Sequence, residues 1–122
     1  MNKQSIEKYV KREDGQLDVH SIFHTIQGEG PLSGTPAIFI RLAGCNCQCP
    51  VCDTDYTSKR DLLDVETILN NVKDLHKSPY LVVITGGEPF RQDLGELIDI
   101  LWLNNYNIQI ETNGTLCPSE IW

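Results

Sequence analysis

The sequence predicts an α/β fold in which a parallel sheet of about four strands carries helices on one face. Short apolar runs of strand length alternate along the chain with stretches in which apolar residues recur every three or four positions. Strand–helix–strand connections are right-handed crossovers, which join parallel strands and leave their helices on one side of the sheet. A single folding unit is expected, because 122 residues lie within the usual size of one domain.

The first half of the chain predicts two strands joined by a glycine-rich turn. Residues 1–16 are polar and charged, and we expect them to form an N-terminal arm ahead of a core at 17–122. Val19–Phe23 alternates as a half-buried strand does, and Ala37–Leu42 reads as a second strand. The turn between them is centred on Gln27–Pro31.

Two stretches of the second half have helical spacing. One runs from Asp64 to His76 with Asp64 as a plausible N-cap, and the other follows Asp93, with Glu96 three residues on as in a capping box. A strand is predicted after each helix, at Tyr80–Ile84 and at Asn107–Thr112.

Composition excludes several classes of partner. Seventeen acidic against ten basic side chains give a net charge of −7, which disfavours binding to a nucleic-acid backbone. No stretch approaches the roughly 18 apolar residues of a membrane span, and Met1–Glu7 lacks the apolar core of a signal peptide. We expect a cytoplasmic protein, because its five cysteines are clustered as for metal binding rather than spread as in a disulfide framework.

Three cysteines, at Cys45, Cys49 and Cys52, form the most informative cluster. Clusters that only transfer electrons are normally held by four cysteines, so three thiolates can hold a four-iron cluster and leave one iron open. Structural zinc is the alternative, but it usually needs two cysteine pairs on separate turns. We expect Cys47 to stand between ligands without binding, and Cys117 to be a small buried residue or a free thiol.

A second cluster follows the strand predicted at Tyr80–Ile84. Thr85–Pro89 places two glycines and a carboxylate at the carboxyl end of that strand, where open parallel sheets bind their ligands. Glycine lets a ligand approach the backbone closely, and Glu88 can accept hydrogen bonds from an ammonium group.

The two clusters together resemble the radical S-adenosylmethionine superfamily. The resemblance implies a 4Fe–4S cluster on the three cysteines, whose open iron is chelated by the methionyl group of S-adenosylmethionine. It also implies a partial β/α barrel of about six strands. We place about four, so we expect the N-terminal part of that barrel, without its C-terminal third. The residues that the resemblance assigns to S-adenosylmethionine are Gly86, Gly87, Glu88, Glu111, Thr112 and Asn113.

A closer resemblance covers five motifs in order, namely Phe23–Gly30, Arg41–Asn46, Cys52–Thr54, Thr85–Pro89 and Glu111–Thr115. They are similar to the 7-carboxy-7-deazaguanine synthase family, which contracts the ring of 6-carboxy-5,6,7,8-tetrahydropterin with release of ammonia and requires Mg²⁺. The resemblance implies Thr54 as the Mg²⁺ ligand, an electron donor such as flavodoxin, and a homodimer. It assigns the pterin substrate to Gln27, Gly28, Glu29, Arg41, Thr85 and Gly87.

The residue types suit this substrate. A glutamine and a glutamate can read the flat donor–acceptor edge of a pterin, and an arginine can form a bidentate pair with its carboxylate. No general base is evident, so no catalytic residue is named. The ordinary alternatives are a solvated Glu29, an Arg41 paired with a structural carboxylate and a Thr54 that caps a turn.

Two other kinds of function stay open. A glycyl-radical activase shares the cysteine and glycine clusters, but it gives no reason for Gln27–Gly30 or Arg41. A non-catalytic module that binds an iron–sulfur cluster or zinc is the other.

Overall fold

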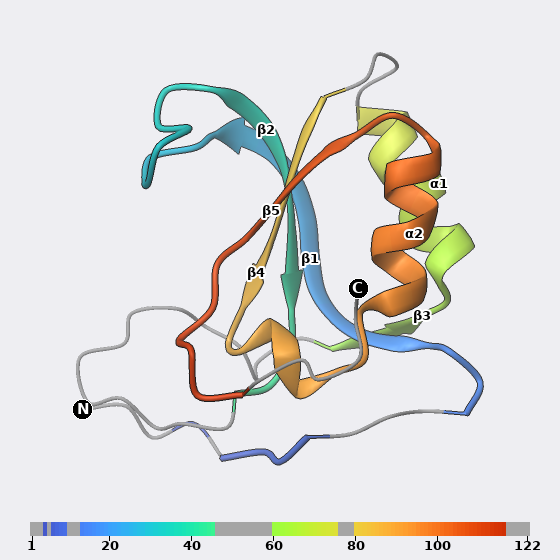
Figure 1. Ribbon diagram of the computed structural model, residues 1–122. Coiled ribbons are helices and arrows are strands. Elements are labelled where there is room, and N and C mark those ends of the chain that lie inside the picture. Colours follow the sequence, from blue (N-terminus) through green and yellow to red (C-terminus); the bar gives the residue numbers. More distant parts are fainter. Residues whose placement is uncertain (1–3, 5, 10–12, 46–59, 76–79, 117–122) are drawn as a thin grey trace.

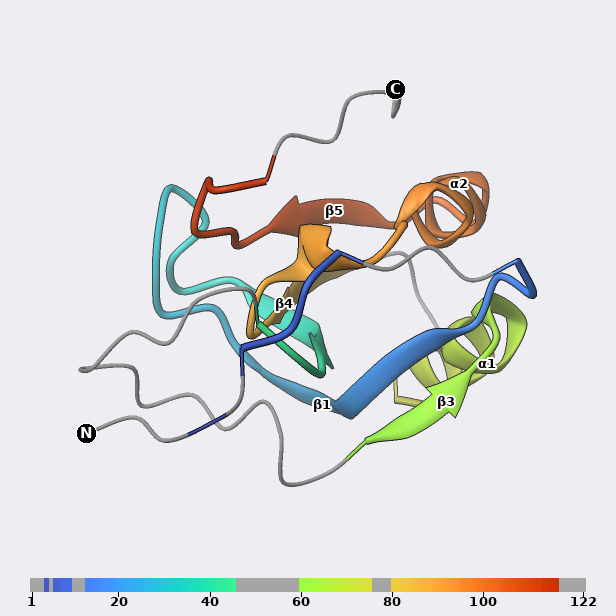
Figure 2. The same cartoon turned by 90° about the horizontal axis from the view of Figure 1, so that it is seen from below.

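The computed structural model describes residues 4, 6–9, 13–45, 60–75 and 80–116. These residues form a five-stranded sheet in the order β3-β1-β2-β4-β5, with two helices on one face (Figure 1). The two helices pack against each other, and the view from below shows them side by side on the same side of the sheet (Figure 2). The α/β class with helices on one face is therefore confirmed.

The strands do not all run the same way. β2 (Pro36–Leu42), β4 (Leu81–Gly86) and β5 (Asn107–Ile110) are parallel, whereas β1 (Leu17–Ile26) is antiparallel to β2. The expectation of a wholly parallel sheet was wrong for this first strand. Residues 27–35, which connect β1 to β2, form a hairpin connection, and parallel strands need a crossover of a dozen or more residues.

The four predicted strands are present with shifted ends, and one strand was missed. β3 (Asp61–Leu63) pairs antiparallel with the start of β1 at the edge of the sheet. Its three residues are too few for an alternating pattern, and two of them are exposed, so the sequence carried no strand signal there.

The helices match the predicted spacing, but only one has the predicted cap. α1 (Val65–Leu75) begins after Asp64, whose Oδ1 accepts a hydrogen bond of 2.8 Å from the backbone N–H of Thr67. α2 (Gly95–Leu103) has Leu94 at its N-cap position, without a side-chain hydrogen bond. The capping box expected at Asp93 and Glu96 was wrong, because Asp93 lies one residue too early and accepts from the Gly95 N–H at 3.0 Å.

The apolar residues divide between the two faces of the sheet. The larger cluster fills the space between the sheet and the helices. We call its residues on the two central strands the covered face: Ile38, Ile40 and Leu42 of β2, and Val82 and Ile84 of β4. A smaller cluster lies on the opposite side, which we call the open face: Ala37, Phe39, Leu81 and Val83, with Phe23 packed against them. Within the described part of the chain, no helix is long and apolar enough to cross a membrane.

Candidate functional site

Three of the predicted motifs meet at one end of the sheet. β2, β4 and β5 end at the same edge, because Leu42 pairs with Gly86 and the N–H of Glu111 donates to the Ile84 carbonyl at 2.9 Å. We call this region the carboxyl edge: residues 43–45 after β2, 86–88 at the end of β4 and 111–113 after β5. Open parallel sheets bind ligands at such an edge, so the topology places the predicted motifs where a site is expected.

Cys45 is the member of the cysteine cluster that the structure describes. It is buried, with 6% of its surface exposed, and its sulfur lies 4.0 Å from the Asn113 side-chain nitrogen, which donates toward it. The predicted ligands Cys49, Cys52 and Thr54, and also Cys47 and Cys117, lie outside the described residues. Among the residues that are described, no three metal-ligating side chains form a group.

The two glycines after β4 are required by the backbone that follows β2. A Cβ atom at Gly86 would lie 2.3 Å from the Leu42 carbonyl oxygen, and the φ angle of +144° disfavours any other residue. A Cβ atom at Gly87 would lie 2.3 Å from the Gly44 oxygen and 2.7 Å from the Cβ of Cys45. These glycines thus let the end of β4 pack directly against the backbone of Leu42 and Gly44 and against the side chain of Cys45.

Glu88 joins the second motif to the third. It is 1% exposed, and its Oε2 accepts a hydrogen bond of 2.7 Å from the Phe90 N–H, which caps the short 3₁₀ helix η1 (Pro89–Arg91). Its Oε1 accepts from the Thr112 hydroxyl at 2.7 Å and from the Asn113 N–H at 2.8 Å. The carboxylate therefore fixes the loop after β5, and its contact with a methionyl amino group stays a prediction.

Arg41 lies on the open face beside Thr85. The two residues are register partners across β2 and β4, and side-chain alternation puts Arg41 on the same face as Phe39. Its guanidinium stacks over the Phe23 ring, with 5.2 Å from Cζ to the ring centroid. The Nε atom of Arg41 is buried and has no hydrogen-bond partner among the described residues. The structural carboxylate considered as an alternative partner for Arg41 is likewise not found in the described part of the chain.

The glycine turn places Gln27 and Glu29 differently. Gln27 is 1% exposed, and its Nε2 donates to Gln109 Oε1 at 2.7 Å and to Glu111 Oε2 at 3.0 Å. The side chain of Glu29 is exposed, and its N–H donates to the Gln27 Oε1 at 3.2 Å. Gly28 between them is exposed as well. Gln27 therefore links the turn to the end of β5, and substrate contacts of these residues stay predictions.

Sequence analysis missed a buried polar cluster behind the carboxyl edge. Arg91 is 3% exposed, and its Nη2 donates to the Ala43 carbonyl at 2.9 Å and to Asp18 Oδ2 at 3.4 Å. Gln92 exchanges two hydrogen bonds with the backbone of Asp18, at 2.7 and 3.0 Å. A Cβ atom at Gly44 would lie 2.5 Å from Arg91 Nε, so this cluster packs against the residue before Cys45. No local sequence pattern indicates these contacts, because Asp18 lies more than seventy positions from Arg91 and Gln92.

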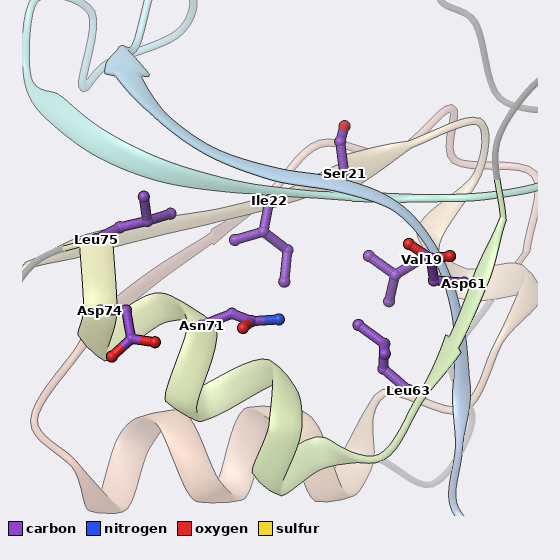
Figure 3. A pocket seen from close by; sticks show the side chains of 8 residues that line it. All are labelled: Val19, Ser21, Ile22, Asp61, Leu63, Asn71, Asp74 and Leu75. Atoms are coloured by element: carbon purple, nitrogen blue, oxygen red, sulfur yellow. The ribbon is translucent and has the colours of Figure 1, made fainter.

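A cavity lies elsewhere in the fold. It has a volume of about 310 Å³ and is lined by residues of β1, β3 and α1, among them Ile22, Asp61 and Asn71 (Figure 3). None of the predicted site residues lines it, so it is separate from the carboxyl edge.

The comparison with protein families identifies the class of this protein. The family described as the Radical SAM superfamily matches residues 39–121, and the chain belongs to that superfamily. The match spans the cysteine cluster and the glycine motif of the carboxyl edge. The recognition made from the motifs is therefore confirmed at the level of the superfamily.

Individual relatives narrow the resemblance. The chain is 50% identical over 116 residues to the 7-carboxy-7-deazaguanine synthase of Rickettsia prowazekii, an alignment that covers 88% of this chain and 49% of the relative. It is 39% identical to the synthase of Escherichia coli, over 88% of this chain and 59% of that protein. The chain is thus a homologue of these synthases, and it spans about half the length of the curated relatives that it matches.

A solved structure supports the fold assignment. The crystal structure of QueE from Escherichia coli matches with a TM-score of 0.73 and 36% identity, over 88% of this chain and 58% of that one. The predicted partial barrel of the radical S-adenosylmethionine type is confirmed by this match. The boundary predicted between an arm at 1–16 and a core at 17–122 stays a prediction.

The described residues fit the cofactors that the superfamily implies, a 4Fe–4S cluster and S-adenosylmethionine. Cys45 places a buried sulfur at the carboxyl edge of parallel strands, and Cys49 and Cys52 add two more soft thiolate donors in the sequence. The sulfur of Cys45 lies beside the two motifs assigned to S-adenosylmethionine. The role of Mg²⁺ stays a prediction.

Proposed function

We propose that this chain takes part in the ring contraction of 6-carboxy-5,6,7,8-tetrahydropterin to 7-carboxy-7-deazaguanine with release of ammonia. It would act as this enzyme or as the part of it that carries the cluster and the first substrate contacts. The relatives named 7-carboxy-7-deazaguanine synthase support the proposal, because the chain is 50% and 39% identical to two of them over 88% of its own length.

Arg41 is the observation that carries the proposal. A stacked guanidinium with a buried, unpartnered Nε within the described chain is a cation prepared for an anion, and its planar fork matches a carboxylate. It lies on the open face next to the carboxyl edge, and its register partner on the neighbouring strand is Thr85. A glycyl-radical activase has no need for a carboxylate site there, and a structural zinc site has none either.

The division of labour follows from these positions. Cys45, Cys49 and Cys52 would hold the cluster, and the bound cluster and S-adenosylmethionine would supply the 5′-deoxyadenosyl radical that abstracts a hydrogen atom from the substrate. Arg41 would orient the substrate carboxylate. Gln27 would hold the carboxylate of Glu111, the residue that follows β5, through its side-chain hydrogen bond. Thr54 would bind Mg²⁺, and an electron donor such as flavodoxin would deliver the electron.

Homodimer formation is part of the proposal. β5 pairs with β4 on one side, and no described strand pairs with its other edge. An unpaired edge presents backbone N–H and C=O groups with which a second copy of the chain can pair. Sedimentation of the full chain would decide between a monomer and a dimer.

The decisive experiment is anaerobic reconstitution of the full chain with iron and sulfide. We expect about four irons and four acid-labile sulfides per chain, and a reduced cluster whose paramagnetic resonance spectrum changes when S-adenosylmethionine is added. Cys45→Ala should abolish the cluster, while Cys117→Ala, outside the triplet, should load normally. A colourless protein that holds one zinc, or a cluster that does not respond to S-adenosylmethionine, would refute the proposal.

Substrate class is tested on the loaded protein. Under reduction, the carboxypterin should be converted to the deazaguanine product, which mass spectrometry detects. A cluster that responds to S-adenosylmethionine but cleaves it without using the carboxypterin would favour the activase reading instead.

A further inference from the structure

One residue of the N-terminal segment holds both described neighbours of the segment 46–59. The backbone N–H of Glu7 donates to the Cys45 carbonyl at 2.7 Å, and Ile6 beside it forms a parallel bridge with Cys45. The carboxylate of the same Glu7 accepts two hydrogen bonds from Arg60, from Nη1 at 2.8 Å and from Nη2 at 2.5 Å. Glu7 thus ties the residue that precedes this segment to the residue that follows it.

Buried charges reinforce this arrangement. Arg91 Nη1 lies 3.8 Å from Glu7 Oε1 and donates to the Lys8 carbonyl at 3.4 Å. Asp18 lies 3.4 Å from Arg91 and 3.7 Å from Arg60. Two arginines and two carboxylates therefore alternate behind the carboxyl edge, and each arginine faces both carboxylates.

A surface ion pair alone would contribute little, because solvent screens it and two long side chains must be ordered. The pair of Glu7 and Arg60 differs in three ways. It is bidentate, it is partly buried, and it shares a residue with the backbone hydrogen bond to Cys45. The hydrogen bond from Arg60 lowers the pKa of Glu7, and the hydrogen bond from Glu7 raises the pKa of Arg60, so both groups are charged at neutral pH.

Fixing the two ends of a chain segment lowers the conformational entropy that the segment loses when it binds something. The segment 46–59 carries two of the three predicted cluster ligands, Cys49 and Cys52, and follows directly on the third. A residue that fixes both ends therefore lowers the entropic cost of gathering three thiolates around one cluster.

We infer that Glu7 is a positioning residue for the iron–sulfur cluster, a clasp that holds Cys45 through its backbone and Arg60 through its carboxylate. This inference rests on the proposed function, because it requires that the three cysteines bind the cluster. It assigns a role to the N-terminal segment, which lies outside the five motifs.

The test compares the rate at which reconstituted full-length protein loses iron to a chelator without oxygen. Glu7→Gln keeps the backbone N–H and removes the charge, and we expect iron release about five times faster than in the wild type. Arg60→Gln should behave alike, and Arg60→Lys, which keeps the charge, should recover part of the loss. The double variant should accelerate release by less than the product of the two single effects, because the two side chains bond to each other. Glu66→Gln, at an exposed position in the first turn of α1, is the matched control and should not change the rate.

A second readout needs no cluster. The protection factor of the residue 7 amide, the exchange rate of the same residue in an unfolded chain divided by the rate observed, reports the hydrogen bond to the Cys45 carbonyl in cluster-free protein. Glu7→Gln should lower this protection factor about fivefold, while Glu66→Gln should not.

The outcomes separate the two proposals. A wild-type chain that takes up no cluster refutes the proposed function, and the clasp with it. A wild-type chain that loads normally, with Glu7→Gln releasing iron at the same rate or keeping the protection factor at residue 7, refutes the clasp alone.

Discussion

The two faces of the sheet use neighbouring residues of the same strands for different purposes. Along β2, Ile38, Ile40 and Leu42 face the helices and are fully buried from one end to the other. On the open face, the same strand is apolar only at Ala37 and Phe39.

Arg41 follows these two apolar residues, and β4 repeats the change when Leu81 and Val83 give way to Thr85. Because side chains alternate along a strand, one short sequence can build a core on one side and a polar site on the other. The covered face therefore stabilises the fold along its whole length, whereas the open face does so only away from the carboxyl edge. Substitutions on the two faces should separate stability from ligand binding.

The largest expected effect is at Gly86, where the end of β4 meets the backbone after β2. Gly86→Ala should lower the free energy of unfolding by at least about 5 kcal/mol, because the new methyl group would overlap the Leu42 carbonyl oxygen and that backbone atom has no rotamer to change. Urea unfolding or the yield of folded protein measures the loss.

Gly114→Ala is the matched control for this glycine. Its φ is +76°, but a Cβ atom there would meet nothing within 4 Å. The free energy of unfolding should therefore fall by only about 1–2 kcal/mol, the cost of backbone strain. Equal losses for Gly86→Ala and Gly114→Ala would mean that backbone strain, and not the contact between the two strand ends, decides the result.

One identical substitution on each face tests the comparison directly. Leu42→Ala removes a side chain from the large cluster between sheet and helices and should cost about 3–5 kcal/mol. Leu81→Ala acts on the small open-face cluster, where Phe23 and Phe39 can move to fill the space, and should cost about 2 kcal/mol. Urea unfolding of the two variants supplies both values, and equal costs would contradict the difference between the faces.

The covered face was the more predictable one. Short apolar runs located the strands, with period-two alternation in the first of them, and helical spacing located α1 and α2, because these patterns arise from burial in the core. The direction of β1 was predicted wrongly: alternation is the same in parallel and antiparallel strands, and only the short connection at residues 27–35 indicates a hairpin. The capping pattern at Asp93 failed because Leu94, an apolar residue, occupies the N-cap position.

The carboxyl edge was predicted only in outline. Parallel strands bring their carboxyl ends together, so Cys45, Gly87 and Asn113 were expected at one place, and they are found there. The partners of these residues could not be predicted, because contacts such as that of Asp18 with Arg91 depend on how distant elements pack. Gln27 shows the same limit: its amide is bonded to the end of β5, which no local pattern indicates.

Arg41 should affect substrate binding more than folding. Arg41→Ala removes the expected bidentate partner of the substrate carboxylate, and kcat/KM should fall by about 30- to 100-fold, which is about 2–3 kcal/mol. Arg41→Lys keeps a charge without the planar fork and should lose about tenfold. The free energy of unfolding should fall by only about 1 kcal/mol, the contribution of the stacking on Phe23.

A substrate analogue without the carboxylate is the control for Arg41. The wild type and Arg41→Ala should process it at similar rates, because the analogue has no carboxylate for Arg41 to bind. If Arg41→Ala slowed the analogue as much as the carboxypterin, the guanidinium would act on the protein rather than on the substrate.

The smallest expected effect is at Gly28, in the turn between β1 and β2. Gly28 has no positive φ, and a Cβ atom there would meet nothing within 4 Å, so the fold does not require glycine at this position. Gly28→Ala should leave the free energy of unfolding within about 0.5 kcal/mol of the wild type. If the substrate approaches this backbone closely, KM should rise about fivefold, or about 1 kcal/mol, with kcat unchanged.

Gly34→Ala on the same turn gives the opposite pattern. Its φ is +91° with no neighbour within 4 Å, so it should lose about 1–2 kcal/mol of stability and leave KM unchanged. Unchanged KM in Gly28→Ala would remove this residue from the substrate site. The role of the turn in the site would then rest on Glu29 and Gln27. Glu29 is exposed and would contact the substrate, and Gln27 is buried and would act through its hydrogen bonds to Gln109 and Glu111.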